Sequence, residues 1–279
     1  DPLIVSMGLS HIFKGLSMST PSLTRTIRMQ VPANLEHLVE GPNTYAGTPL
    51  TEGIGAYFEI DVRCVGPLDA TSGYVEEIHE IDRQVREKCV PMLADAMTGP
   101  APASVARLVK LLHGAVDSSL DSTVDLLGLR LSPYHEVRME CPEMNQATLA
   151  RRYTFSASHW LRNPDLDDEG NYAVFGKCSH PNGHGHNYEL EVRVLIPAGD
   201  DAMNVVELDT IVETRVLSLL DHKHLNLDVD AFKELNPTLE NIAATCYHLL
   251  DAHLDAPSGR LSGVRVWETD RTSCEYPTP

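Results

Sequence analysis

Apolar and polar side chains alternate along two segments of the chain, at residues 59–67 and 189–197. The first reads Glu59-Ile-Asp-Val-Arg-Cys-Val-Gly-Pro67 and the second reads Glu189-Leu-Glu-Val-Arg-Val-Leu-Ile-Pro197. An apolar residue at every second position is typical of a strand that is buried on one face only. The segments lie 130 residues apart, from 59 to 189, which suggests that one structural unit occurs twice.

Two further pairs of segments support this repeat. Residues 102–112 line up with residues 237–247 at an offset of 135, and both predict a helix that begins after a proline-containing turn. Leu127-Gly-Leu-Arg-Leu131 matches Ser262-Gly-Val-Arg-Val266 at the same offset and predicts a strand in each half. Because the three matches occur in the same order, we predict a duplicated unit.

Each unit is predicted to run strand, strand, helix, helix, strand, strand. In the second half, we expect strands near residues 148–156, 187–196, 263–268 and 271–276, and helices near 207–220 and 238–252. This predicts an α+β chain of two tandem units, each a four-stranded antiparallel sheet with two helices on one face. Pro133 and Pro142 favour a junction over residues 132–147, so we divide the chain into residues 1–145 and 146–279.

The composition argues against several classes of partner and location. The 279 residues carry a formal net charge of −18, with a pI near 5.0, which disfavours nucleic acid or an anionic membrane as a partner. No apolar run approaches the roughly 18 residues of a membrane span, and residues 1–20 do not resemble a signal peptide. The 6 cysteines are scattered and form no tight framework, so we expect reduced thiols and a cytoplasmic protein.

Three histidines in the second half have the spacing of a metal site. His184 and His186 are two residues apart, so both side chains point to the same side of an extended strand. His159, at the end of Phe155-Ser-Ala-Ser-His159, lies on the preceding predicted strand and is able to complete the set. Three imidazoles with an open fourth position are typical of a catalytic zinc. Ligand type alone also admits iron, nickel or cobalt.

Other polar residues near this site have both a functional and a structural interpretation. Cys178 follows Lys177 in a polar loop, where a positive neighbour favours a reactive thiolate; the alternative is a small buried residue. Asp221 and His222 follow a predicted helix. They either form a carboxylate–imidazole pair or are surface polar residues at the helix C-terminus, where His222 and Lys223 complement the helix dipole. Glu268, at the end of an apolar strand, is either a strand-end charge or a two-point acceptor for a heterocycle.

The first half has none of this chemistry. At an offset of 130, the positions that correspond to His159, His184 and His186 are Met29, Ile54 and Ala56. We therefore expect residues 1–145 to form a degenerate unit without a metal site, which acts as a structural partner of the second unit.

The motifs of the second half together resemble the 6-pyruvoyl-tetrahydropterin synthase family, which includes the 6-carboxytetrahydropterin synthases of the queuosine pathway. The resemblance spans about residues 150–276 and depends on five motifs in family order: Phe155-Ser-Ala-Ser-His159; Phe175-Gly-Lys-Cys178 with Pro181-Asn-Gly-His184-Gly-His186-Asn-Tyr188; Asp221-His222-Lys; Pro237-Thr-Leu-Glu240-Asn241; and Glu268-Thr. It implies the tunnelling fold (T-fold), in which such units assemble into barrels. Tandem units also occur in this fold, as in urate oxidase.

The resemblance also implies residue roles. His159, His184 and His186 would bind Zn²⁺. Cys178 would act as the general base, with Asp221 and His222 as a second proton-transfer pair. Glu268 would anchor the pterin ring, and Glu240 and Thr238 would contribute to substrate binding. Active sites of the family lie between units, which implies a homo-oligomer.

The implied reaction converts 7,8-dihydroneopterin triphosphate into 6-pyruvoyl-tetrahydropterin with loss of triphosphate. The five residues between Cys178 and His184 resemble the pyruvoyl-type enzymes; the queuosine-type enzymes usually have a shorter loop. Three alternatives remain open: a 6-carboxytetrahydropterin synthase, a non-catalytic pterin- or metal-binding protein, and a zinc hydrolase. The joint presence of Cys178, Asp221, His222 and Glu268 argues against the second, because a binder needs only Glu268. Against the third, the reactive group near the ligands is Cys178 and not the carboxylate base of a His-Glu-x-x-His pattern.

Overall fold

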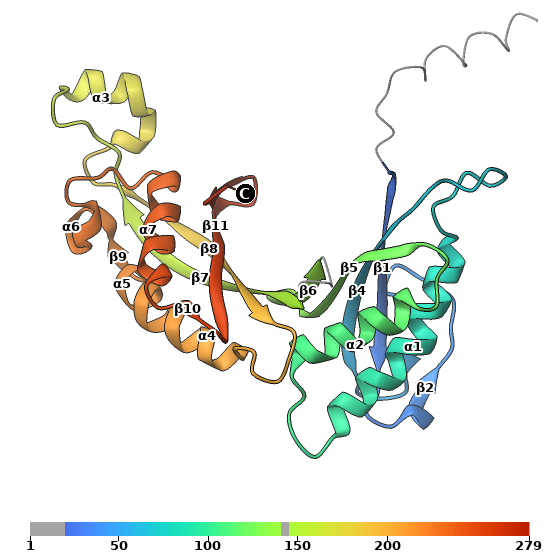
Figure 1. Ribbon diagram of the computed structural model, residues 1–279. Helices are drawn as coiled ribbons and strands as arrows, with labels where there is room; N and C mark the ends of the chain where they lie inside the picture. The colour runs from blue at the N-terminus through green and yellow to red at the C-terminus, as the bar shows by residue number, and fades with distance from the viewer. Residues whose placement is uncertain (1–19, 141–144, 279) are drawn as a thin grey trace, which may run out of the picture.

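The computed structural model describes residues 20–140 and 145–278, and one large sheet runs through both halves of the chain (Figure 1). The sheet has ten strands, of which β1, β4, β5, β6, β7, β8, β11 and β10 follow one another, while β12 pairs with β11 and β9 with β7. Their bounds are β1 Ser22–Val31, β4 Ala56–Val65, β5 Thr123–Ser132, β6 His135–Glu140, β7 Gln146–His159, β8 His184–Pro197, β9 Lys223–His224, β10 Asp255–Ala256, β11 Gly259–Thr269 and β12 Thr272–Tyr276.

Two sets of four antiparallel strands carry the helices, and this confirms the predicted α+β architecture of two T-fold units. In the first set α1 packs against β1, and α2 packs against β5 and β6. In the second set α7 packs against β11 and β12. The helices are α1 Ile78–Thr98, α2 Val105–Asp117, α3 Asp168–Phe175, α4 Val205–Val212, α5 Ser218–Leu220, α6 Leu225–Asp228 and α7 Leu239–Asp251. Shorter elements are β2 Leu38–Val39, β3 Leu50–Thr51, the 3₁₀ turns η1 Leu35–His37, η3 Gly176–Ser179 and η5 Asp230–Phe232, and the π-helical turn η4 Glu213–Leu217.

The alternating segments form equivalent strands, β4 and β8. In β4 the apolar side chains of Phe58, Ile60 and Val62 are buried beneath the helices, whereas Glu59 and Asp61 point to the opposite face. The pattern read from the sequence therefore reports which face each side chain occupies. No helix of the described residues is long and apolar enough to cross a membrane.

Two boundaries differ from prediction. The junction predicted over residues 132–147 contains β6, because a proline in a tight β5–β6 turn reads like a proline in a linker. Pro142 lies outside the described residues. The helix predicted over residues 207–220 is instead α4, η4 and α5 in succession. The division at residue 145 remains a proposal, since β6 pairs with β7 and the sheet continues through it.

The structure also corrects one correspondence between the units. Met29 pairs with Phe58, as Phe155 pairs with Tyr188, so Met29 is the counterpart of Phe155 and not of His159. The constant offset failed because equivalent paired residues lie 29 positions apart in the first unit, from Met29 to Phe58, and 33 apart in the second, from Phe155 to Tyr188.

The position that does correspond to His159 also lacks a ligand. Continuing the β1–β4 register by two residues places Ala33 opposite Ile54, at the position of His159 opposite His184. Neither side chain offers a donor atom to a metal. In the described part of the chain, the only cluster with metal-ligand geometry is the one in the second unit.

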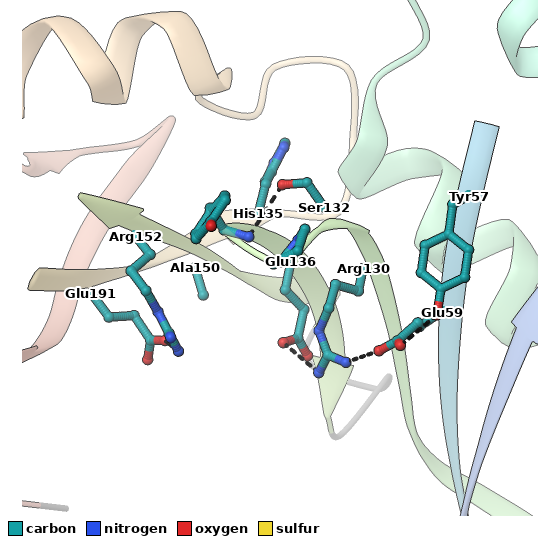
Figure 2. A pocket seen from close by; sticks show the side chains of 11 residues that line it. Tyr57, Glu59, Arg130, Ser132, His135, Glu136, Ala150, Arg152 and Glu191 are labelled. Carbon is teal, nitrogen blue, oxygen red and sulfur yellow. Dashed lines mark hydrogen bonds and ion pairs between the residues drawn. The ribbon is translucent and has the colours of Figure 1, made fainter. Parts of the chain in front are cut away.

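We call the face of the sheet opposite the helices the open face. Ion pairs line it. Five join neighbouring strands: Arg28–Glu59, Arg130–Glu59, Arg130–Glu136, Arg152–Glu189 and Arg152–Glu191. A sixth joins Arg193 of β8 to Glu275 of β12, across β11. Figure 2 shows the central part, where Arg130 reaches Glu59 and Glu136, and Arg152 lies beside Glu191. Ala150, which is small, pairs with Glu136. The cavity there measures about 320 Å³.

Candidate metal centre and active site

Three histidine side chains converge where β7 ends and β8 begins. His159 is paired directly with His184, and His186 lies two residues further along β8 on the same face. One ring nitrogen of each histidine lies within 4.8 Å of those of the other two. His159 is almost fully buried, with 1% of its surface exposed. The structure thus brings together the three ligands predicted from their spacing.

The hydrogen bonds of the cluster direct ring nitrogens toward its centre. Nδ1 of His159 donates to the carbonyl oxygen of Pro237 at 2.8 Å, which leaves Nε2 with a lone pair. That Nε2 lies 3.1 Å from Nε2 of His184, and Nε2 of His186 is buried without a partner among the described residues. A shared cation satisfies all three nitrogens at once, so this donor set fits zinc.

The cluster also favours the uncharged imidazoles that a metal requires. Burial, and secondarily the neighbouring histidines, lower the pKa of His159 to about 4, although the bond to Pro237 opposes this. Burial and His186 likewise lower the pKa of His184. Both rings are therefore available as neutral ligands near neutral pH.

Glu268, whose predicted role is to anchor the pterin ring, lies close to the histidines themselves. Its Oε1 is 3.6 Å from Nε2 of His159 and 3.5 Å from Nε2 of His186. Trp267 pairs with Glu189, so one further step of the β8–β11 register puts Glu268 opposite Tyr188. Residues opposite each other share a face of the sheet, which explains why the carboxylate points at the metal ligands.

Cys178 lies in η3, directly after helix α3. This helix projects beyond the sheet in Figure 1. The Leu161 amide donates to the carbonyl oxygen of Cys178 at 2.8 Å, which ties η3 to the chain just after β7. Helix α3 is tied to the loop before it by buried Asn171. The side-chain amide of Asn171 donates to the carbonyl oxygens of Asn163, Leu166 and Asp167. The thiol is partly exposed and free. The other described cysteines are free too, and Cys141 lies outside the described residues.

Asp221 and His222 form the predicted pair. Nδ1 of His222 donates to Oδ2 of Asp221 at 2.8 Å, and Oδ1 of Asp221 accepts from the Ser156 amide at 2.8 Å. The His222 amide donates back to the Ser156 carbonyl at 2.7 Å. This clamp holds His222 at φ 57°, a left-handed conformation that is uncommon for residues other than glycine. The hydrogen bond from the Ser156 amide lowers the pKa of Asp221. The hydrogen bond from His222 lowers this pKa further, whereas slight burial opposes the change.

Thr238 and Glu240 lie at the start of α7. Thr238 is the N-cap and accepts from the Asn241 amide at 3.4 Å, while Glu240 is exposed in the first turn. The adjoining carbonyl of Pro237 orients His159, so this turn supports the cluster through its backbone. No described side-chain bond joins Thr238 or Glu240 to the histidines.

Two residues of this region were missed from the sequence. Tyr188 is fully buried and stacks on Phe155, yet its hydroxyl has no partner among the described residues. It lies two residues after His186, so the strand period was the signal that places it beside the cluster. His224 has both ring nitrogens buried and unpartnered, and its ring centroid lies 4.5 Å from that of Trp160. No local pattern announces that contact.

A pocket of about 390 Å³ adjoins the candidate site. It is lined by residues of β7, β8 and the β9 segment, among them Ser156, His186, His222 and His224. The cavity of Figure 2 is a weaker candidate, because Arg130 and Arg152 are already paired with carboxylates and none of its lining residues belongs to the histidine cluster.

Comparisons with known proteins concern mainly the second half. The family model for 6-pyruvoyl tetrahydropterin synthase matches residues 148–279. The human 6-pyruvoyl tetrahydrobiopterin synthase is 42% identical over 134 residues, which are 47% of this chain and 91% of that protein. A probable 6-carboxy-5,6,7,8-tetrahydropterin synthase of Halobacterium salinarum is 39% identical over 88 residues, 30% of this chain and 49% of that protein. The structure of Caenorhabditis elegans 6-pyruvoyl tetrahydropterin synthase is 32% identical, with a TM-score of 0.45, covering 48% of this chain and 96% of that one.

Proposed function

Because the chain belongs to the 6-pyruvoyl tetrahydropterin synthase family, we propose that it converts 7,8-dihydroneopterin triphosphate into 6-pyruvoyl-tetrahydropterin and triphosphate. The observation that carries the proposal is the convergence of His159, His184 and His186, which the family relationship then assigns to zinc. The reaction needs no external oxidant, since the pterin ring is reduced as its side chain is oxidised and triphosphate is eliminated.

We assign a separate step of the proposed reaction to each group of residues. Zinc, when bound, would supply a Lewis acid and a template for the substrate's side-chain hydroxyls. Cys178, as the thiolate, would accept a proton from a side-chain carbon. The Asp221–His222 pair would move a second proton, because the Nδ1 bond to Asp221 leaves Nε2 of His222 free to accept one. We assign Glu268, Glu240 and Thr238 to substrate binding, as the resemblance implies.

The second candidate is the 6-carboxytetrahydropterin synthase reaction. The spacing from Cys178 to His184 favours the pyruvoyl product. So does the extent of the match, which covers 91% of the human relative but 49% of the 6-carboxy relative. A non-catalytic pterin-binding protein ranks third, because a binder has no need of the Asp221–His222 clamp.

We further propose a cytoplasmic homo-oligomer whose sites lie between units. Among the described residues, β1 and β12 each pair on one edge only, so both ends of the sheet offer backbone groups to another strand. His222 has 83% of its side chain exposed, which suits a residue that meets the rest of its site across an interface. Analytical ultracentrifugation tests this: a monomer at working concentration would contradict it.

The deciding experiment incubates the zinc-loaded protein with 7,8-dihydroneopterin triphosphate and identifies products by mass spectrometry, with and without sulfite. A 6-pyruvoyl product with released triphosphate supports the leading proposal. A 6-carboxy product with acetaldehyde moves the protein to the second candidate. Unchanged substrate with zinc bound would favour the binding protein. The Cys178→Ala variant separates a lyase from a zinc hydrolase, since only the lyase depends on the thiol.

A further inference from the structure

The Glu268 carboxylate has no conventional partner in the described part of the chain. Its side chain is 23% exposed and accepts no hydrogen bond there. The distances to His159 and His186, 3.6 and 3.5 Å, exceed the roughly 2.7–3.2 Å of an N–H···O bond. Among the same described residues, no Arg or Lys is paired with it either. A half-buried carboxylate in this state requires a positive charge close by.

The same distances agree with ligands that share one metal ion. Tetrahedral zinc, with Zn–N and Zn–O bonds of about 2.0–2.2 Å, separates neighbouring donor atoms by roughly 3.3 Å. The donor atoms here lie 3.1 Å apart for His159 and His184, 3.6 Å for His159 and Glu268, and 3.5 Å for His186 and Glu268. Glu268 thus lies within reach of two of the three histidines, and the four side chains come from three neighbouring strands, β7, β8 and β11.

We propose that Glu268 is the fourth ligand of the metal in the substrate-free protein, which makes the resting site His₃Glu. This inference rests on the proposed function, because it takes the histidine cluster to be the zinc site. A bound carboxylate lowers the net charge of the centre from +2 to +1 and closes the position that a substrate oxygen needs. Substrate must therefore displace Glu268, and only then is the carboxylate free to grip the pterin ring.

Metal affinity and metal spectroscopy test the proposal without an activity assay. The full-length protein, the Glu268→Gln variant and a matched control, Asp270→Asn, are loaded with Zn²⁺ or Co²⁺. Asp270 lies two residues after Glu268 in the sequence, just beyond the end of β11, and its side chain is 91% exposed. We expect Glu268→Gln to bind zinc at least about tenfold more weakly in a chelator competition, and Asp270→Asn to match the wild type.

Two spectra identify the ligand. The ligand-field spectrum of the Co²⁺ protein should change in Glu268→Gln only. Infrared difference spectra of the zinc-loaded minus the metal-free protein should show a shifted carboxylate stretch that Glu268→Gln abolishes. Wild-type affinity with an unchanged Co²⁺ spectrum in Glu268→Gln would overturn the inference and leave the proposed function standing. If the wild-type protein binds no zinc, both fail together.

Discussion

Replacing Tyr188 by Phe should make the protein more stable and less active. The Tyr188 ring is fully buried, and its centroid lies 4.9 Å from that of Phe155, so the substitution keeps the stack and removes only the hydroxyl. Burial, and then the charges of Glu268 and Cys178, raise the pKa of this phenol, so the group removed is a neutral O–H. That hydroxyl has no hydrogen-bond partner among the described residues.

The size of the change in stability follows from the hydrogen bond that the Tyr188 hydroxyl lacks. A buried polar group without a partner costs about 1–3 kcal/mol, and Phe removes the cost while leaving a void of only one oxygen. We expect the lower end, about 1 kcal/mol, because lost dispersion contacts offset part of the gain. For a chain of this size, that corresponds to a rise in Tm of about 2–4 °C.

Activity should change in the opposite direction. An unpartnered hydroxyl beside the histidines lowers stability, and such groups usually persist because a ligand or the reaction uses them. Thermal unfolding and product formation are measured on metal-loaded wild type and Tyr188→Phe at equal protein concentration. Phe155→Leu serves as a control that disturbs the stack and retains the hydroxyl. A fall in Tm for Tyr188→Phe would refute the reasoning, because it would mean that the hydroxyl is already satisfied in the resting protein.

The remaining predictions concern the proton carriers and the first unit. Cys178→Ala should lower product formation by about 10²–10⁴-fold while zinc content stays at the wild-type level, and loss of zinc would contradict the assigned role. Asp221→Asn should lower turnover over a similar range of about 10²–10⁴ with an altered pH–rate profile, since Asn cannot stabilise a charged His222; an unchanged profile would exclude the pair. Asp82 is buried, which opposes ionisation, but hydrogen bonds from Arg25 and the charge of Arg86 prevail and lower its pKa. Its contribution is therefore complete above the unfolded carboxyl pKa of about 3.9 and is lost as pH falls through the folded value. Asp82→Asn should lower the urea midpoint near neutral pH and lessen its dependence on acid, whereas a midpoint equal to wild type would show that the pair contributes nothing.

What the sequence predicted well was local. The alternation around Leu190 and Val192 identified both the strand and its buried face, and the same period placed His184 and His186 together. Motif order then supplied His159, which a strand pattern alone does not connect to them.

What it missed depends on contacts between distant segments. The bond from His159 to the carbonyl of Pro237 involves a backbone atom, which no side-chain pattern records. The approach of Glu268 to His186 follows from the register between β8 and β11, and that register is fixed only when the sheet assembles. β6 was overlooked because Pro133, in the β5–β6 turn, resembles a proline of a linker.

The short β6–β7 ladder has a consequence for the composition of any assembly. It joins the two units within one chain, through four residue pairs from His135–Arg151 to Arg138–Thr148. A neighbour on the same chain cannot be exchanged, so the unit that carries the histidine cluster always meets the unit without it along this edge of β7. The ratio of units with the histidine cluster to units without it is then one to one at any protein concentration. Mutations that destabilise the first unit should therefore also lower the yield of folded histidine cluster, although none of the three histidines belongs to that unit.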